Sequence, residues 1–328
     1  MTVATGVGSM PGEDAAAFAE AVRLVLGETP DLPFLPELPG RGAPASMTGR
    51  ALAVMAELGA DLQPAGWRLT DAPGVDHRRA RSLLSQDLDA LEERTQGYEG
   101  RFKIQVAGPW TLAATVERPR GDRVLADHGA RRELAQALAE GLAAHVADVR
   151  RRLPGAELVV QVDEPALPAV LAAQVPTASG FHRHRSVHPA GASPALEWVL
   201  GAARDAGAVP VVHCCASDVP VSLLVGAGAG GLSVDLSALA LEQYDEVAGV
   251  LDKGHQLLLG VVPTTAPDPV PGDRALTDRV LRFLDMLGFD PDTVGDRLAV
   301  TPACGLAGAD PAWARRALTL SRQVAANL

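Results

Sequence analysis

Short apolar runs rich in β-branched residues recur along the whole chain, separated by amphipathic stretches with a helical period. Eight such runs are present, at residues 3–7, 33–35, 102–106, 157–162, 209–212, 231–234, 256–262 and 298–300. The helical stretches cover residues 15–26, 47–62, 80–94, 131–151, 194–206, 236–251, 274–287 and 311–326. Strands that alternate with helices predict an α/β fold with a parallel sheet, and eight repeats predict one closed (β/α)8 TIM barrel. A doubly wound open sheet is the alternative that the same alternation allows.

Two details inside this pattern are also predicted. Ser193 followed by Pro194 is typical of a helix N-cap and a first helical residue, so a helix is expected to begin there. The interval between the second and third apolar runs is the longest. It is expected to hold two helices joined by a connector at residues 67–69.

The length of the chain agrees with a barrel. A chain of 328 residues is long for one ordinary domain, but α/β barrels often exceed the usual length as single domains. No linker divides the chain, because proline and glycine are spread out and the richest segment, residues 263–271, is typical of a loop between a strand and a helix. We therefore expect a single catalytic barrel domain over residues 1–328.

Charge and cysteine content exclude several classes of protein. The net charge is −11, from 29 Lys and Arg against 40 Asp and Glu, which argues against nucleic acid as a partner. The three cysteines are too few for a disulfide framework. The N-terminus lacks a signal pattern, and no apolar run approaches the roughly 18 residues of a membrane span. We expect a soluble cytoplasmic protein with no membrane partner.

Polar or reactive side chains follow the apolar runs directly. Because the carboxyl ends of barrel strands meet at one rim, side chains far apart in sequence are expected to lie together there, at the face where barrel enzymes place their chemistry. This coincidence predicts an enzyme. The residues concerned include Ser9, Glu37, Trp110, Asp163, His213, Cys215, Asp235 and Cys304.

Soft metal ligands are prominent among these residues. His213 and Cys215 are two positions apart on a strand, so both point to one face while Cys214 points away. With Cys304 they form a thiolate and imidazole set that suits a catalytic zinc ion, and Asp235 is the natural fourth ligand. A zinc ion there would ionise a substrate thiol. The alternative is that both cysteines are buried as small hydrophobic residues and that His213 is hydrogen-bonded in the core.

Other polar residues allow two interpretations. Asp163, next to Glu164 and Pro165, would bind a substrate ammonium or move a proton, but two acids before a proline also mark a helix start. Glu37 lies between prolines and is also typical of an ordinary loop residue. Ser9 is equally typical of a turn or of a helix cap. His145 shares a helix face with leucines and is interpreted as structural. The His- and Arg-rich residues 181–188 would bind an anion or a second metal, although most such runs are solvated loops.

Taken together, the motifs resemble the C-terminal catalytic barrel of cobalamin-independent methionine synthase, within the uroporphyrinogen decarboxylase and methionine synthase-like superfamily. The matching elements occur in the family's order across nearly the whole chain. They are Gly8-Ser9-Met10-Pro11, Gly108-Pro109, Gln161-Val162-Asp163-Glu164-Pro165-Ala166-Leu167, His213-Cys214-Cys215 and Pro302-Ala303-Cys304-Gly305-Leu306.

The resemblance implies a reaction and roles. It implies methyl transfer from a methylated folate to the zinc-bound thiolate of homocysteine, giving methionine. It implies that His213, Cys215 and Cys304 bind zinc, with Asp235 in the place of the family's glutamate. It further implies that Ser9, Glu37 and Asp163 hold the amino-acid end of homocysteine, which makes Asp163 the candidate catalytic residue.

The chain departs from the family in three respects. Full-length members carry a second, N-terminal barrel, whereas this chain has one. Asp235 is one methylene shorter than glutamate. The folate-related positions also differ. The expected aromatic falls near Thr115, with Trp110 as the nearby candidate for substrate binding, and the histidine expected after the seventh strand falls within residues 262–265.

Without an acid at residues 262–265, a folate amine is harder to expel, so the donor is either a methylated folate or another methyl carrier such as a methyl-corrinoid. Two further hypotheses follow. One is alkyl transfer to another small thiol, or a decarboxylase-like reaction without zinc. The other is a non-catalytic paralogue that binds zinc or homocysteine. Metal content and turnover on a panel of thiols and donors separate the three.

Overall fold

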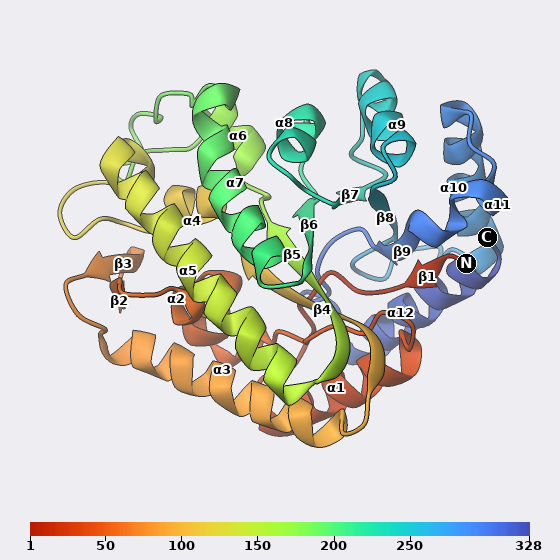
Figure 1. The fold of residues 1–328 in the computed structure, drawn as a ribbon, viewed down its shortest axis with the longest axis horizontal. Coiled ribbons are helices and arrows are strands. Elements are labelled where there is room, and N and C mark those ends of the chain that lie inside the picture. The colour runs from red at the N-terminus through yellow and green to blue at the C-terminus, as the bar shows by residue number, and fades with distance from the viewer.

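The computed structural model describes residues 1–328 and contains seven parallel strands in one sheet, in the order β1-β9-β8-β7-β6-β5-β4. The long helices lie around the outside of this sheet (Figure 1). The predicted α/β fold with a parallel sheet is therefore confirmed. The strands are β1 (Val3–Ala4), β4 (Glu99–Ala107), β5 (Gly155–Asp163), β6 (Val209–Cys214), β7 (Gly231–Asp235), β8 (Gln256–Val262) and β9 (Leu298–Pro302).

The second apolar run forms no strand, so a complete eight-stranded barrel is not shown. The segment instead connects the two edge strands through isolated bridges: Phe34 pairs with Lys103 of β4, and Glu37 pairs with Ser9 just beyond β1. Pro33 and Pro36 flank this segment, and a proline cannot donate to a ladder of hydrogen bonds. The prolines explain why the pairing stays isolated.

All eight predicted helices are present, six of them with ends within about five residues of the prediction. The helix predicted over residues 47–62 ends at Val54, and the one predicted over residues 236–251 begins only at Tyr244. The longer ones are α1 (Ala15–Glu28), α2 (Met47–Val54), α3 (Val75–Arg94), α5 (His128–Arg152), α7 (Pro189–Asp205), α9 (Tyr244–Asp252), α10 (Asp273–Leu287) and α12 (Pro311–Ala326). The shorter ones, which the periodicity did not predict, are α4 (Pro109–Thr115), α6 (Leu167–Leu171), α8 (Val221–Gly226) and α11 (Pro291–Val294). Single 3-10 turns occupy Pro39–Arg41, Ala43–Ala45, Val124–Ala126, Leu241–Gln243 and Gly295–Arg297.

The interval between the second and third apolar runs holds two helices, α2 and α3, with residues 67–69 between them, as predicted. The connector is an antiparallel hairpin of β2 (Gly59–Gln63) and β3 (Gly66–Thr70), which was not predicted. The predicted helix start at Ser193 and Pro194 was wrong. Helix α7 begins at Pro189, with His188 as its N-cap, so Pro194 lies inside the helix. Pro194 lies beyond the first turn, where N–H groups lack a partner in any helix, so it removes one intrahelical hydrogen bond near the start of α7.

The interior of the sheet changes from apolar to polar along its strands. A small buried cluster of Leu32, Val159, Val211, Leu258 and Ala299 is separate from the main core of 84 residues. Side chains alternate along a strand, so the positions two residues further on face the same way. Those positions are polar in three strands, namely Gln161, His213 and Thr301. The carboxyl ends of the strands therefore surround a polar interior above an apolar floor.

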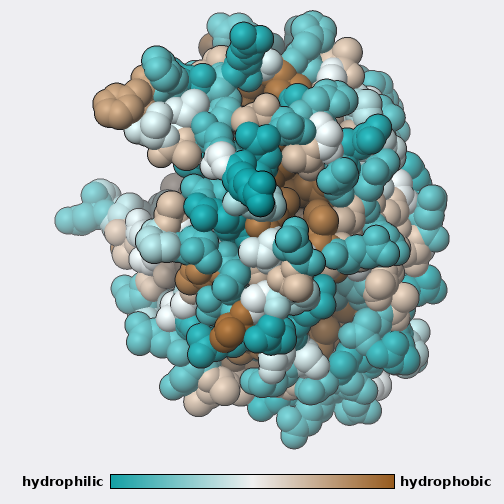
Figure 2. Space-filling model, turned by 90° about the vertical axis from the view of Figure 1, so that its left-hand side faces the viewer, coloured by the Kyte–Doolittle hydropathy of each residue, from teal (hydrophilic) through white to brown (hydrophobic).

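None of the helices has the length and hydrophobicity needed to cross a membrane. Figure 2 shows the side of the molecule that lies at the left in Figure 1. Hydrophilic residues cover most of it, and hydrophobic residues gather in small recessed groups.

Helix α5 contains a buried histidine that makes stability depend on pH. Burial, helped by Arg50, lowers the pKa of His145 from 6.5 to about 4. Below pH 6.5 the unfolded chain therefore binds more protons at this histidine than the folded chain does. The free energy of unfolding is unaffected above pH 6.5 and decreases as the pH falls towards 4. The full decrease amounts to about 3 kcal/mol.

Urea unfolding between pH 7 and 4.5 checks this prediction. The acid-induced loss of unfolding free energy should be smaller in His145→Gln than in the wild type. The same substitution at the exposed His182 is the matched control and should leave the loss unchanged. Equal losses in the wild type and in both variants would show that His145 is not the cause.

Candidate metal centre and substrate site

Three soft donors meet at the carboxyl ends of β6 and β9. The ligand atoms of His213, Cys215 and Cys304 all lie within 4.8 Å of one another. The two sulfur atoms are 2.8 Å apart, and the Cys304 sulfur lies 3.7 Å from Nε2 of His213. The structure thus brings together three of the four residues for which the sequence predicted metal binding.

The imidazole of His213 is oriented from behind by Ser233. Its Nδ1 lies 2.9 Å from the Ser233 hydroxyl, and Ser233 is its neighbour in register on β7. This contact leaves Nε2 directed at the sulfurs, as the ring of a metal-binding histidine is normally held. The sequence analysis missed Ser233, although a serine inside an apolar strand beside the His213 strand was an available signal.

The two clustered thiols differ in their proton affinity. A hydrogen bond from Cys215, helped by His213, lowers the pKa of Cys304, and the same bond together with burial raises the pKa of Cys215. These shifts favour the thiolate form at Cys304, and the thiolate is the form that binds metals. Cys214 points away as predicted and is buried in the core, where burial raises its pKa to about 12.

These residues fit a zinc ion. Bonds of about 2.3 Å to sulfur and about 2.0 Å to nitrogen in a tetrahedral site place ligand atoms roughly 3.5 Å apart. The separation of 3.7 Å between Nε2 of His213 and the Cys304 sulfur agrees with this span. The two sulfurs, at 2.8 Å, are closer than the roughly 3.8 Å that two zinc-bound sulfurs require, so they would have to move apart by about 1 Å to hold the ion. Two thiols and one imidazole also form the ligand class and number typical of a catalytic zinc site.

Asp235, the expected fourth ligand, is not in this group. One of its carboxylate oxygens accepts hydrogen bonds from the backbone N–H and the hydroxyl of Ser237, at 2.8 and 2.5 Å. Such a local turn is a common alternative for a short acidic side chain. Asp235 still ends β7, the strand that pairs with β6.

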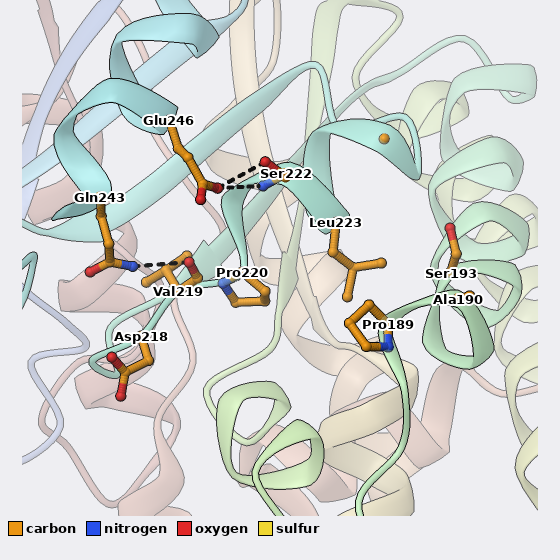
Figure 3. A pocket seen from close by; sticks show the side chains of 11 residues that line it. Pro189, Ala190, Ser193, Asp218, Val219, Pro220, Ser222, Leu223, Gln243 and Glu246 are labelled. Carbon is orange, nitrogen blue, oxygen red and sulfur yellow. Dashed lines mark hydrogen bonds between the residues drawn. The ribbon is translucent and has the colours of Figure 1, made fainter.

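The loop that follows Cys215 is held by α9 and the turn before it. Figure 3 shows an open pocket of about 650 Å³ beside this loop, between α7, α8 and α9. Gln243 donates to the Val219 carbonyl at 3.0 Å, and Glu246 accepts from the N–H and hydroxyl of Ser222. None of the metal donors lines this pocket. The role of these contacts is to anchor the loop after Cys215 and the start of α8 to α9 and the turn before it.

Asp163 lies at the end of β5, in register with His213. It is buried, and Nε2 of Gln161 donates to it at 2.7 Å. Burial raises its pKa to about 7, and Glu37 adds to this, while His213, Gln161 and Lys103 oppose it. This carboxyl is thus a buried acid beside the metal donors with no ion-pair partner.

Lys103 and Gln161 jointly fix the start of the Gly8–Pro11 loop. Both side-chain nitrogens donate to the carbonyl of Val7 at 2.8 Å. Burial lowers the pKa of Lys103 to about 8, against the attraction of Asp163 and Glu37. The sequence analysis missed this lysine. Its place inside an apolar strand was a usable signal, because charged side chains are rarely buried without a role.

Ser9 and Glu37 are neighbours, but their side chains have different surroundings. The Glu37 carboxylate forms an ion pair with Nε of Arg50 at 3.1 Å, and both side chains are buried. Arg50 also pairs with Asp87 at 2.7 Å. The charge of Glu37 is therefore already balanced by protein. Ser9 lies against the backbone of Gly305, where any Cβ would clash with its hydroxyl, so this glycine brings the Cys304 loop close to Ser9.

Glu164 and Trp110 hold helix α4. The buried Glu164 carboxylate accepts from the backbone N–H groups of Trp110 and Thr111 and from the Thr111 hydroxyl, at 2.7 to 2.9 Å. Burial raises its pKa to about 7 in spite of these bonds. The Trp110 indole donates to the Ala192 carbonyl of α7 at 3.1 Å and is 3% exposed. The structure thus places Trp110 between two helices.

Removing the Glu164 carboxylate is expected to destabilise the protein by roughly 3 kcal/mol or more, because Glu164→Ala leaves three buried donors without an acceptor. Glu164→Gln keeps one acceptor oxygen and should lose about half as much. Urea unfolding measures both. The exposed Glu197→Ala is a control expected to change stability little. Equal losses of stability in Glu164→Ala and Glu197→Ala would show that the hydrogen bonds from Glu164 to the start of α4 do not stabilise the protein.

The chain is similar to known proteins in sequence and in fold. Residues 102–327 match the family model described as "Cobalamin-independent synthase, Catalytic domain". No curated protein matches the chain. Among solved structures, a B12-independent methionine synthase from Shewanella sp. W3-18-1 in complex with selenomethionine is 13% identical, with a TM-score of 0.65, and the match covers 100% of this chain and 97% of that one.

A second solved structure, the β-mannanase from the blue mussel Mytilus edulis, is 10% identical with a TM-score of 0.49, over 97% of this chain and 91% of that one. At 13% identity the match to the B12-independent methionine synthase shows the fold alone. The family model spans well over half of the chain. The chain therefore belongs to the cobalamin-independent methionine synthase family, as a catalytic domain.

Proposed function

We propose that this protein is a zinc-dependent S-methyltransferase that transfers a methyl group to the thiolate of homocysteine, giving methionine. The observation that carries the proposal is the convergence of His213, Cys215 and Cys304 at the carboxyl ends of the strands of a family member. The donor is a methylated folate or another methyl carrier.

The chain's own residues divide the work. His213, Cys215 and Cys304 would hold zinc, with Asp235 as the fourth ligand if it turns away from Ser237. A zinc ion bound there supplies the positive charge that ionises a substrate thiol at neutral pH. Ser233 keeps Nε2 of the imidazole directed at this position.

Asp163, Ser9 and Glu37 would hold the amino-acid end of homocysteine. Asp163 has the larger part, because Arg50 already balances the charge of Glu37. Burial disfavours the ionised form of the Asp163 carboxyl, and a substrate ammonium beside it would stabilise that form. Lys103 and Gln161 act as positioning residues, since they hold the loop that carries Ser9.

In the transfer step the new S–CH3 bond forms as the donor's bond to methyl breaks, and the electron pair of that bond stays on the donor. A folate amine then takes up a proton. At the position where an acid is expected, residues 263–265 are Pro-Thr-Thr, and the carbonyl of Pro263 accepts from the Trp313 indole at 3.1 Å. No acid lies in this segment, which favours a donor whose leaving group needs no proton, such as a methyl-corrinoid.

We further propose that residues 1–328 act as one catalytic domain. In this arrangement the segment of residues 33–37 takes the place of the eighth strand, since its two bridges connect β4 with the end of β1.

Two measurements test the proposed function. Purified protein should contain about one zinc per chain and should convert homocysteine to methionine with at least one of methyl-folate and methylcobalamin. Faster turnover with methylcobalamin is the expected result. Protein that binds no zinc and methylates no thiol from either donor would overturn the proposal.

A further inference from the structure

A separate cavity of about 280 Å³ lies between the first turns of α5 and α7, next to α4. Its walls include the side chains of Trp110, Trp198, Arg131, Arg132 and His128. None of the metal donors lines this cavity, and neither does any residue proposed to bind the amino-acid end of homocysteine. Trp110, which the sequence suggested for substrate binding, contributes to the wall because its ring turns towards α7.

The cavity has cationic walls without carboxylate partners. Arg131 makes one hydrogen bond, from Nε to the Asp127 backbone carbonyl at 3.4 Å, and Arg131, Arg132 and His128 make no ion pair. Asp127 is the acid nearest to Arg131. Its carboxylate caps α5 through the Ala130 N–H at 2.9 Å and pairs with Arg118 at 3.3 Å. In a chain with a net charge of −11, the two unpaired arginines beside one cavity favour an anion.

The same cavity offers aromatic surface. The Arg131 guanidinium lies over the Trp110 ring, 5.7 Å from its centroid, which holds the cation against the floor of the cavity. Trp198 is 36% exposed, so its indole is partly open to solvent. An open indole beside a fixed guanidinium suits a flat ring that bears a carboxylate.

The volume limits the size of the occupant. Pockets for drug-sized ligands begin at about 300 Å³, so a cavity of about 280 Å³ suits one or two fused rings with a small substituent. We propose that this cavity binds a small aromatic carboxylate, with the ring against Trp198 and the carboxylate on Arg131 and Arg132.

The cavity is linked to the metal centre through α4. The Trp110 backbone N–H donates to Glu164, and the Glu164 backbone N–H donates to the His213 carbonyl at 2.8 Å. Because of this link, a substitution in the cavity could change methyl transfer indirectly. The test for the cavity therefore measures binding alone, and its outcome does not depend on the proposed activity.

Calorimetric titration of the full chain with 2-naphthoate and with its neutral analogue 2-naphthamide tests the proposal. Naphthoate should bind saturably, about tenfold or more tightly than naphthamide, because the charge-assisted hydrogen bonds are lost in the amide. Arg131→Gln and Trp198→Ala should each weaken naphthoate binding about tenfold, and high salt should weaken it as well.

The matched control is Arg274→Gln, an exposed arginine on α10, which lies on the other side of the molecule (Figure 1). It should bind naphthoate like the wild type. Far-UV circular dichroism confirms that each variant is folded. Equal affinity for naphthoate and naphthamide, or affinity that Arg131→Gln and Trp198→Ala leave unchanged, would overturn the proposal.

Discussion

Cys304→Ser is expected to lose the bound zinc and with it at least 100-fold in affinity for homocysteine. The serine hydroxyl stays protonated at neutral pH and is a poor ligand for a metal that prefers thiolate and imidazole. In the structure Cys304 contacts both other donors, and the hydrogen bond from Cys215 lowers its pKa. Metal analysis of the purified variant and calorimetry with homocysteine measure the two losses.

The chain supplies its own control for this variant. Cys214 is the same residue type, lies one position from Cys215 and points into the core. Cys214→Ser should therefore keep the zinc and the affinity for homocysteine while losing some stability. If Cys304→Ser retained both zinc and homocysteine, the Cys304 thiol would have another role, such as packing.

Asp163→Asn is expected to lower kcat/KM for homocysteine by about two to three orders of magnitude while the zinc content stays at the wild-type level. The amide removes the buried charge that would face the substrate ammonium, and losing one partner of a buried charge pair costs roughly 2–5 kcal/mol. Steady-state kinetics and metal analysis on the same preparation separate the two effects.

A thiol without an amino group provides the control for Asp163. If the carboxylate binds the ammonium, turnover of 3-mercaptopropionate should change little between the wild type and Asp163→Asn. Glu37→Gln should reduce stability more than substrate affinity, because Arg50 is its partner in the protein. An equal loss of turnover on both thiols would instead give Asp163 a role in the transfer itself.

The strand and helix alternation was predictable because it depends on local patterns. Buried strands read as continuous apolar runs, and β4 to β9 coincide with them to within a few residues. The run at residues 33–35 has the composition of a strand but lies between two prolines, and only the tertiary structure shows that single bridges replace a ladder. The hairpin of β2 and β3 was missed because five-residue strands leave little periodicity to detect.

The metal donors were predictable from residue type and from their place at strand ends. Their surroundings were not, because these depend on neighbours that come from other elements. Trp110 follows a strand in sequence like the other candidates, yet its ring is covered by α7 and Arg131. Asp235 ends the correct strand, but a local turn with Ser237 holds its carboxylate.

Residues that support the site form a third class. Ser233 contacts His213 across two neighbouring strands, in the register of the sheet. Lys103 and Gln161 reach from β4 and β5 to the Val7 carbonyl beyond β1, a contact that depends on how the sheet curves. A sequence reader sees the polar residue inside an apolar run but not the partner across the ladder. The recognition of such residues therefore required the structure.

X-ray absorption at the zinc edge tests the central claim most directly. Zinc-loaded protein should show two sulfur ligands and at least one imidazole nitrogen, from Cys215, Cys304 and His213, and the addition of homocysteine should raise the number of sulfur ligands to three. A spectrum with fewer than two sulfur ligands, or one that homocysteine leaves unchanged, would contradict the account.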